Sequence, residues 1–403
     1  MVEQAAVRAA VDEVDPDEVL RFARMLITTP SENPGGTEDD VAEVAMAILE
    51  DLDGSPRIVR GEAGRPSVIA RFGSADRPAL AWNGHLDVVP AGDPETWRHP
   101  PFGAEIVDGR LIGRGAADMK GPIAAALGAV SAIRRSGVGL GGRLDLHLVA
   151  DEELAGLHGT KVLLERGDLD QDAAIVGEPT ELNLALAERG GAWITARARG
   201  KAAHGSTPHL GVSAITSMAR FLLRIEEVLP DIEHPLVGRP SVNAALIDGG
   251  SAPNVVANRC VVEIDRRVIP GERAAETVLA PFDALTASIR DEHPEVDLSF
   301  VVKMWTDAAE TTGDSGIADL CRDAVRTETG REPLDTGFTG ITDARFYIND
   351  RSIPSVILGP GSLTVAHMVN ESVEVAELVT AARVYARVFI EFLAVDGGSE
   401  RGV

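Results

Sequence analysis

The chain has 403 residues, of which 44% are hydrophobic and 25% are charged, and its formal net charge at pH 7 is −25. This length favours two domains over one core, and the acidic balance argues against nucleic acid or anionic membranes as partners, because both need a basic surface. With two cysteines, Cys260 and Cys321, and no apolar run approaching the roughly 20 residues of a membrane span, we expect a cytoplasmic protein without disulfides.

The first part of the chain alternates helix and strand signals. Asp15-Pro16-Asp17 opens a helix with acidic residues near its N-terminus, where the helix dipole favours them, and residues 39–52 have helical apolar spacing. Apolar runs then alternate with helical segments. This pattern predicts an α/β domain with a mostly parallel central sheet flanked by helices.

Several apolar runs of this part, and one near the C-terminus, end in acidic or imidazole side chains. In an open α/β sheet, ligands bind beyond the carboxyl ends of the strands, so these side chains predict a metal centre at one edge. The runs are 79–84 before His85, 143–150 before Asp151-Glu152-Glu153, 173–177 before Glu178, and 354–358, which continues through a Gly-Pro-Gly loop toward His367.

Asp118 lies in the glycine-rich segment 113–121, just before an alanine-rich helical stretch. Taken alone, it is equally well explained as a helix cap. Two metal ions about 3.5–4 Å apart need one bridging carboxylate and separate ligands for each ion. Asp118 with His85, Glu153, Glu178 and His367 provides that count. Mixed imidazole and carboxylate ligands suit Zn²⁺, with Co²⁺ or Mn²⁺ as alternatives.

Two acids beside these ligands are candidates for supporting roles. Asp87, two residues after His85, would hold the second imidazole nitrogen; the alternative is an exposed loop acid. Glu152 directly precedes Glu153, so the two side chains cannot easily point the same way. Glu152 is therefore the candidate base that takes a proton from water and delivers it to a leaving amine, with a solvated acidic loop as the alternative.

After Glu188 the pattern changes to that of a compact α+β unit inserted into the main domain. We place the boundaries at 1–188 and 303–403 for the two parts of the catalytic domain, with 189–302 as the insert. The elements expected in the insert are strands near 192–200, 242–247, 260–268 and 296–302 and helices near 213–229 and 273–290. The chain returns to helix and strand alternation and ends with a helix near 375–394.

Three polar residues of the insert are candidates for contacts with substrate. His204, in a Gly-Lys-Ala-Ala-His-Gly-Ser loop, either stabilises an oxyanion or is an ordinary loop histidine. Arg267 ends a strand, where a guanidinium can pair bidentately with a substrate carboxylate. Asn254 is either a turn residue or a polar contact.

A glycine-containing run, 336–340, is followed by Thr342, Asp343 and Arg345, and we expect this loop to face the substrate. Most of the other histidines are expected to be structural or exposed. His147 lies inside a strand, where a hydrogen-bonded core imidazole is the default.

These motifs, in this order, resemble the metallo-aminoacyl hydrolases grouped around acetylornithine deacetylase, succinyl-diaminopimelate desuccinylase, aminoacylase and carboxypeptidase G. The resemblance covers nearly the whole chain; each piece alone is weak, but their order and context are highly specific. The matching stretches are 84–90, 97–102, 113–121, Asp151-Glu152-Glu153, 177–180 and the late His367.

The resemblance implies two metal sites. One ion would be held by His85, Asp118 and Glu178. The other would be held by Asp118, Glu153 and His367, with Asp118 and a water bridging the pair. A strained cis peptide is implied after Asp118.

The resemblance also implies the supporting roles. Glu152 matches the general acid/base, and Asp87 matches the residue that orients the first metal-binding imidazole. The insert corresponds to a lid that also forms a homodimer. Its His204 would reach the neighbouring subunit's active site, and Asn254 and Arg267 would face the substrate.

We therefore expect a dinuclear zinc enzyme that hydrolyses the amide bond of a small N-acyl amino acid, in a deacetylase- or desuccinylase-like reaction. Arg267 and Arg345 would bind the substrate carboxylate. The nearest alternative is a metallo-exopeptidase, a carboxypeptidase or dipeptidase, with the same centre. A metal-binding protein without catalysis is a more distant alternative. The presence of both Glu152 and His204 argues against it, because metal storage or sensing needs neither residue.

Overall fold

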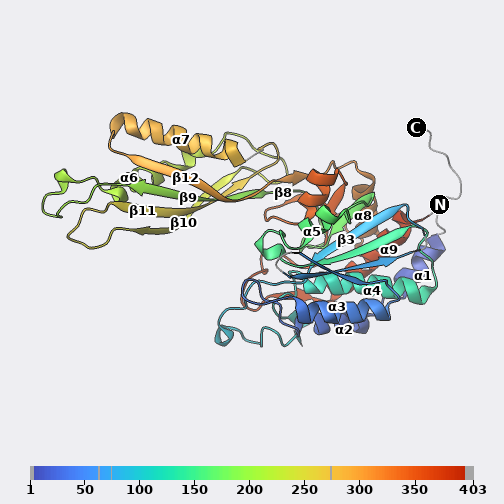
Figure 1. The fold of residues 1–403 in the computed structure, drawn as a ribbon. Coiled ribbons are helices and arrows are strands. Elements are labelled where there is room, and N and C mark those ends of the chain that lie inside the picture. Colours follow the sequence, from blue (N-terminus) through green and yellow to red (C-terminus); the bar gives the residue numbers. More distant parts are fainter. Residues whose placement is uncertain (1–3, 62–63, 74, 273–274, 395–403) are drawn as a thin grey trace. The chain divides into compact units, whose positions relative to one another are not determined.

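The computed structural model describes residues 4–61, 64–73, 75–272 and 275–394, and Figure 1 shows its elements along the chain. The chain divides into two compact units. The first comprises Met1–Leu186, Glu310–Phe338 and Thr342–Val403, and the second comprises Ala187–Ala309 and Thr339–Ile341. The predicted fold class is confirmed, because a central mostly parallel sheet with helices is accompanied by a separate antiparallel sheet.

The first unit is built on a sheet that has nine strands among the described residues. At its centre β6, β3, β7 and β15 run parallel, and β2 and β8 extend it antiparallel on either side. Every residue of β6, β3 and β7 is buried, as expected for apolar strands covered on both faces. In spatial order the strands are β1 (Arg57–Arg60), β2 (Pro66–Phe72), β6 (Arg143–Val149), β3 (Ala79–His85), β7 (Ala173–Val176), β15 (Ser355–Ile357), β8 (Leu184–Glu188) and β13 (Ala309–Glu310), and β14 (Asp335–Phe338) pairs with β8.

Helix α4 (Lys120–Ser136) is the central helix of the first unit and packs against α2 and α9. It is buried from Lys120 to Ile133, and Gly128 permits close contact with α2, because a Cβ there would lie 2.5 Å from Val19 Cγ2. No helix in the described part of the chain is long and apolar enough to cross a bilayer. The other helices of this unit are α1 (Gln4–Asp12), α2 (Pro16–Ile27), α3 (Asp39–Asp51), α5 (Thr160–Arg166), α8 (Gly316–Thr329) and α9 (Val375–Phe392).

A small antiparallel sheet joins two segments that are distant in sequence. Its strands are β4 (Glu105–Val107), β5 (Arg110–Ile112) and β16 (Ser372–Glu374), with β5 in the middle. Pairing of β16 with β5 sets the loop that carries His367 beside the glycine-rich segment that carries Asp118. This sheet therefore helps to bring two candidate metal ligands together.

The second unit is a four-stranded antiparallel sheet, in the order β10-β11-β9-β12, with helices packed against it. The predicted helix at 213–229 ends early, at Leu222, and a short 3₁₀ turn covers Ile225–Val228, so the apolar spacing serves two helices instead of one. The first two residues of the helix predicted at 273–290 lie outside the described residues. The elements are β9 (Gly190–Arg199), α6 (Ala214–Leu222), β10 (Ser241–Gly249), β11 (Arg259–Val268), α7 (Ala275–Glu292) and β12 (Asp297–Thr306).

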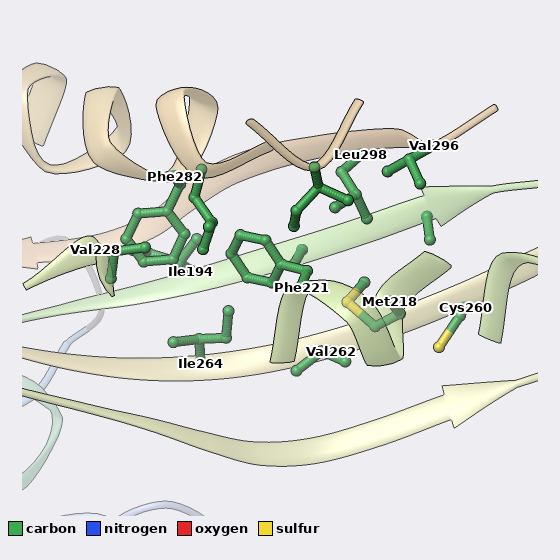
Figure 2. Packing of buried hydrophobic residues seen from close by; sticks show 14 of the residues in the cluster. Ile194, Met218, Phe221, Val228, Cys260, Val262, Ile264, Phe282, Val296 and Leu298 are labelled. Atoms are coloured by element: carbon green, nitrogen blue, oxygen red, sulfur yellow. The ribbon is translucent and has the colours of Figure 1, made fainter. Parts of the chain in front are cut away.

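The core of the second unit lies between its helices and the sheet (Figure 2). Phe221 from α6 and Phe282 from α7 meet with ring centroids 5.9 Å apart, and Phe300 of β12 lies 5.2 and 5.3 Å from them. Buried aliphatic residues, among them Ile194 and Val262, belong to the same cluster.

Truncation of the buried Phe282 to alanine is expected to lower the free energy of unfolding of the second unit by about 3–5 kcal/mol, because apolar contacts are lost and a cavity remains. Urea denaturation followed by circular dichroism measures the change. Leu223→Ala is the matched control, because Leu223 is 87% exposed, and it should alter stability little. Equal effects of the two variants would contradict this view of the core.

His147 lies on β6 in the core of the first unit, where the default interpretation of the sequence put it. Its Nδ1 is 2.7 Å from the hydroxyl oxygen of Tyr347, and burial lowers the pKa of His147 to about 4. In the unfolded chain the pKa is about 6.5. As the pH falls from 6.5 toward 4, the unfolded chain therefore binds a proton that the folded chain does not, so stability is lost in that window.

His147→Asn is expected to reduce this acid-induced loss of stability, because the asparagine oxygen can accept from Tyr347 but does not titrate. At pH 5 the wild-type chain should have lost about 2 kcal/mol through His147 relative to pH 7. Urea titrations of both proteins at the two pH values measure the difference. Equal pH dependence in the two proteins would show that His147 does not cause it.

Candidate metal centre

Five side chains predicted as metal ligands lie at the carboxyl ends of the central strands. Strands β3, β6, β7 and β15 run parallel, so the segments that follow them reach the same edge of the sheet. Asp118 approaches this edge from the loop before α4, and the Asp118–Met119 peptide bond that follows it is cis. The segments carry His85 at the end of β3, Glu153 after β6, Glu178 after β7 and His367 after β15.

The ligand atoms form two groups that share Asp118. In the first group, His85 Nε2 is 2.9 Å from Asp118 Oδ1 and 3.8 Å from Glu178 Oε1. In the second, His367 Nε2 is 3.3 Å from Asp118 Oδ2 and 3.0 Å from Glu153 Oε2. Within each group, one ligand atom per residue lies within 4.8 Å of the others. The two carboxylate oxygens of Asp118 therefore face different groups, as a bridging ligand requires.

The acids of this centre lie close to one another, Asp118 and Glu178 buried and Glu152 and Glu153 half-buried. Burial, with nearby negative charge, raises the pKa of Glu152 and of Glu178 well above the ordinary glutamate value. It also raises the pKa of Glu153. Burial acts on Asp118 in the same direction, but hydrogen bonds from His367 and His85 outweigh it and lower its pKa. The cluster thus brings together carboxyl groups whose negative charge favours bound protons or cations.

The two histidines show how that charge attracts a cation. Hydrogen bonds to Asp118 and Glu153 raise the pKa of His367 to about 10. Burial opposes protonation of His85, but the hydrogen bond to Asp118 and the charges of Glu178 and Glu152 raise its pKa well above the usual value. Divalent cations can replace these protons, since metal binding releases protons from its ligands. The donor set thus fits two divalent ions.

The first imidazole is oriented by Asp87, but not through the carboxylate. His85 Nδ1 lies 2.8 Å from the backbone carbonyl oxygen of Asp87, while the nearest carboxylate oxygen is 3.6 Å away. Donation from Nδ1 to this carbonyl leaves the Nε2 lone pair free for a metal. The contact expected from the sequence is thus made by the same residue's main chain.

The Asp87 carboxylate instead holds the loop that carries the two glutamates. It accepts hydrogen bonds from the backbone N–H groups of Glu152 and Glu153, each at 3.2 Å, and from the amide of Asn33 at 2.8 Å. Asn33 also donates to Asp151 at 3.2 Å. Sequence reasoning missed this network, because residue 33 is far from residues 87 and 151 in the chain.

The segment from Asp151 to Gly156 makes a tight turn. Glu152–Leu154 form a 3₁₀ turn between Asp151, with φ of 66°, and Ala155, with φ of 77°. Non-glycine residues in this left-handed region are strained and cluster at functional sites. Glu152 Oε2 approaches His85 Nε2 at 4.0 Å, while Glu153 contacts His367, so the adjacent glutamates point toward different imidazoles.

A buried ion pair that the sequence analysis missed supports Asp118 and His367 together. Glu371 accepts hydrogen bonds from the backbone N–H groups of Ala117 and Asp118, at 2.9 and 3.0 Å, and pairs with Arg114. Arg114 in turn donates to the carbonyl of His367 at 3.3 Å. The available signal was Arg114 inside the glycine-rich motif, but its partner lies 257 residues later.

The expected substrate-facing loop after 340 is buried in the first unit. Thr342 and Asp343 are fully buried, and Arg345 is 5% exposed. The Arg345 guanidinium donates to the carbonyl of Thr342 and, at 2.6 Å, to the carbonyl of Ala155. This arginine is therefore hydrogen-bonded to the main chain, whereas the sequence analysis expected it to bind a substrate carboxylate.

The other predicted substrate contacts lie in the second unit. The backbone N–H of Gly205, next to His204, donates to the carbonyl of Asn254 at 2.7 Å, so these two candidates lie on adjacent loops. Arg267, on β11, donates to Asp265 at 3.1 Å. The roles of His204, Asn254 and Arg267 as substrate contacts remain predictions.

Comparisons with known proteins agree on one family. The model of the peptidase family M20/M25/M40 matches residues 81–391. The chain is 32% identical over 391 residues to a succinyl-diaminopimelate desuccinylase of Rhodospirillum centenum, covering 94% of this chain and 98% of that protein. It is 34% identical over 394 residues to the protein of the same name from Maricaulis maris, covering 92% and 94%.

Solved structures of this family share the fold. An M20 metallo-carboxypeptidase from Sulfolobus solfataricus superposes with a TM-score of 0.78 at 17% identity, over 94% of this chain and 99% of that one. A dinuclear metal-binding M20 peptidase from Bacillus subtilis gives 0.70 at 16% identity, over 94% and 98%. At these identities, the likeness concerns the fold alone.

Proposed function

The chain belongs to the peptidase family M20/M25/M40, a family of metal-dependent hydrolases, and on this premise we propose that it hydrolyses the amide bond of an N-acyl amino acid with two divalent metal ions. The observation that carries the proposal is the position of Asp118, whose two oxygens face two different imidazole and carboxylate groups. The desuccinylase names of relatives at 32–34% identity favour an N-acyl substrate over a peptide.

The two ions would each have an imidazole, a carboxylate and a share of Asp118 as ligands. His85 and Glu178 would complete the first site, and Glu153 and His367 the second. We propose Zn²⁺ as the metal, with Co²⁺ or Mn²⁺ as alternatives, because mixed nitrogen and carboxylate ligands suit these ions. Bound there, the ions would polarise the scissile carbonyl and lower the pKa of a water between them.

Residues of the chain would carry out the proton transfers and hold the substrate. Glu152, at the edge of the first group, would take a proton from the attacking water and deliver it to the leaving amine. Burial raises the pKa of Glu152 above the ordinary glutamate value. His204 would stabilise the oxyanion, and Arg267 and Asn254 would contact the acyl or amino acid part.

The assembly and location remain proposals that go with this function. A homodimer formed through residues 189–302, acting as a lid domain between catalytic parts 1–188 and 303–403, is favoured by the resemblance noted in the sequence. The exposed edge strand β10 is consistent with it. Two buried free cysteines, Cys260 and Cys321, favour the cytoplasm. Light scattering tests the dimer directly.

A substrate panel tests the proposed activity. The protein is loaded with Zn²⁺, its metal content is measured, and release of free amine from N-acetylornithine, N-succinyl-diaminopimelate and simple dipeptides is compared. We expect an N-acyl amino acid to be hydrolysed at least about 100-fold more efficiently than any dipeptide, a difference of about 3 kcal/mol in transition-state stabilisation. Preference for dipeptides would assign an exopeptidase instead. Two bound metals with no turnover of any substrate would favour a metal-binding protein without catalysis.

A further inference from the structure

The loop of Glu152 and Glu153 is fixed through its main chain. Within the 3₁₀ turn and just after it, five consecutive backbone N–H groups donate hydrogen bonds, although the turn is only three residues long. The backbone of the loop is therefore fixed, and with it the direction in which each side chain leaves the main chain. The acceptors are the Asp87 carboxylate for Glu152 and Glu153, the Asp151 carbonyl for Leu154 and Gly156, and the Glu152 carbonyl for Ala155.

The loop is held from outside at both ends. Asp87 binds its N-terminal end through the N–H groups of Glu152 and Glu153. Arg345 binds its C-terminal end, where its Nη2 donates to the carbonyl oxygen of Ala155 at 2.6 Å. Since Ala155 has a φ of 77°, its carbonyl is presented by a strained conformation that this hydrogen bond helps to maintain.

Arg345 is built into the segment after residue 340 and is not available to solvent. Its guanidinium also donates to the carbonyl of Thr342 and lies 4.3 Å from the centroid of the Phe346 ring. The loop packs directly on this segment, because a Cβ added to Gly156 would lie 2.6 Å from Asp343 Oδ1. To reach a substrate carboxylate, Arg345 would have to break both hydrogen bonds to the main chain.

We infer that Arg345 is a positioning residue for Glu152, acting through the carbonyl of Ala155, and that it does not bind the substrate carboxylate. The inference rests on the proposed function only in giving Glu152 the role of base. Its structural part, that Arg345 fixes the loop from 151 to 156, stands without it. A displaced Glu152 would still lie in the centre but would no longer be aligned with the proton it must take.

The experiment compares Arg345→Met, Arg345→Lys and the control Arg143→Met in the zinc-loaded protein. Methionine has a side chain of similar length but no hydrogen-bond donors, and lysine keeps the positive charge but lacks the planar pair of N–H donors. Arg143 is also buried, but it pairs with Asp145 and Asp170 at the start of β6, six residues before that strand ends. Metal content, kcat, KM and hydrogen exchange of peptides covering 151–159 are measured for each.

We expect Arg345→Met to lower kcat about 100-fold, the size of a misplacement of about 1 Å at a catalytic group, with KM changed less than about 2-fold and two metals retained. Arg345→Lys should recover part of this loss. Exchange in 151–159 should be faster in Arg345→Met but unchanged in Arg143→Met, because only the former frees the loop.

The outcomes separate this inference from the proposed function. A large rise in KM with kcat unchanged would show that Arg345 binds substrate, and unchanged exchange in 151–159 would show that it does not hold the loop; either overturns the inference. Loss of metal would assign Arg345 to support of Glu153 instead, which also overturns it. If wild-type protein hydrolyses no substrate, the proposed function fails, while the exchange comparison still decides whether Arg345 anchors the loop.

Discussion

Asp118→Asn is expected to remove both metal ions and to lower turnover by at least about 1,000-fold. Each of the two ligand groups includes Asp118, and asparagine keeps its shape while removing the charge that both groups share. Two ions held there would together supply several kcal/mol of charge stabilisation in the transition state, and each 1.36 kcal/mol corresponds to a factor of ten in rate. Atomic emission measures metal per chain, and the best substrate of the panel measures turnover.

Two comparisons give this result its meaning. Asp145→Asn replaces another buried aspartate, which lies on β6 and pairs with Arg143 and Gln171. This variant should be less stable but should keep both metals. Glu178→Gln removes a ligand of the first group only, so one metal should remain in the second. Retention of two metals by Asp118→Asn would show that this carboxylate does not bridge them.

The sequence was sufficient to predict which candidate ligands come together, and the reason is topological. His85, Glu153 and Glu178 follow strands that run parallel side by side, so one rule about strand ends is enough to collect them. Asp118 and His367 do not follow from that rule with the same directness. The pairing of β5 with β16 brings the segments that carry them together, and no local sequence pattern predicts this pairing.

The supporting contacts could not be predicted in the same way. Glu371 binds the backbone of Asp118 across 253 residues, and Arg345 binds Ala155 across 190. Both contacts use a main-chain group as partner, and main-chain groups carry no sequence signal of their own. An arginine near an expected site therefore suggested a substrate contact, whereas in the structure its guanidinium donates hydrogen bonds to main-chain carbonyls.

Asp87 shows the same limit within two residues of a ligand. Its position beside His85 predicted that its carboxylate would hold this imidazole, but the atom within hydrogen-bond distance of Nδ1 is its carbonyl oxygen. The carboxylate is then free to bind the loop of Glu152 and Glu153. Spacing identifies a residue as close to a site, but the rotamer and the long-range partners decide which atom acts.

Glu152→Gln is expected to lower kcat by about 100- to 10,000-fold, the contribution of a positioned general acid/base, while two metals remain bound. The glutamine side chain fills the same space but cannot take a proton from water. Its neighbour provides the sharpest comparison, because Glu153 contacts His367 in the second ligand group, whereas Glu152 belongs to neither group. Glu153→Gln should therefore lose a metal, and Glu152→Gln should not.

Comparing Glu152→Gln with Glu153→Gln distinguishes a base from a metal ligand. A control far from the centre shows whether the loss of any one negative charge lowers turnover. Glu165, exposed on α5, is a suitable control, and Glu165→Gln should keep wild-type kcat and metal content. Formate added to Glu152→Ala should restore part of the turnover, because a small carboxylate can enter the space left by the side chain. Near-normal kcat in Glu152→Gln would remove Glu152 from the mechanism, and metal loss in that variant would make it a ligand. Only retained metal with lost turnover fits a carboxylate that moves protons beside the ions without binding them.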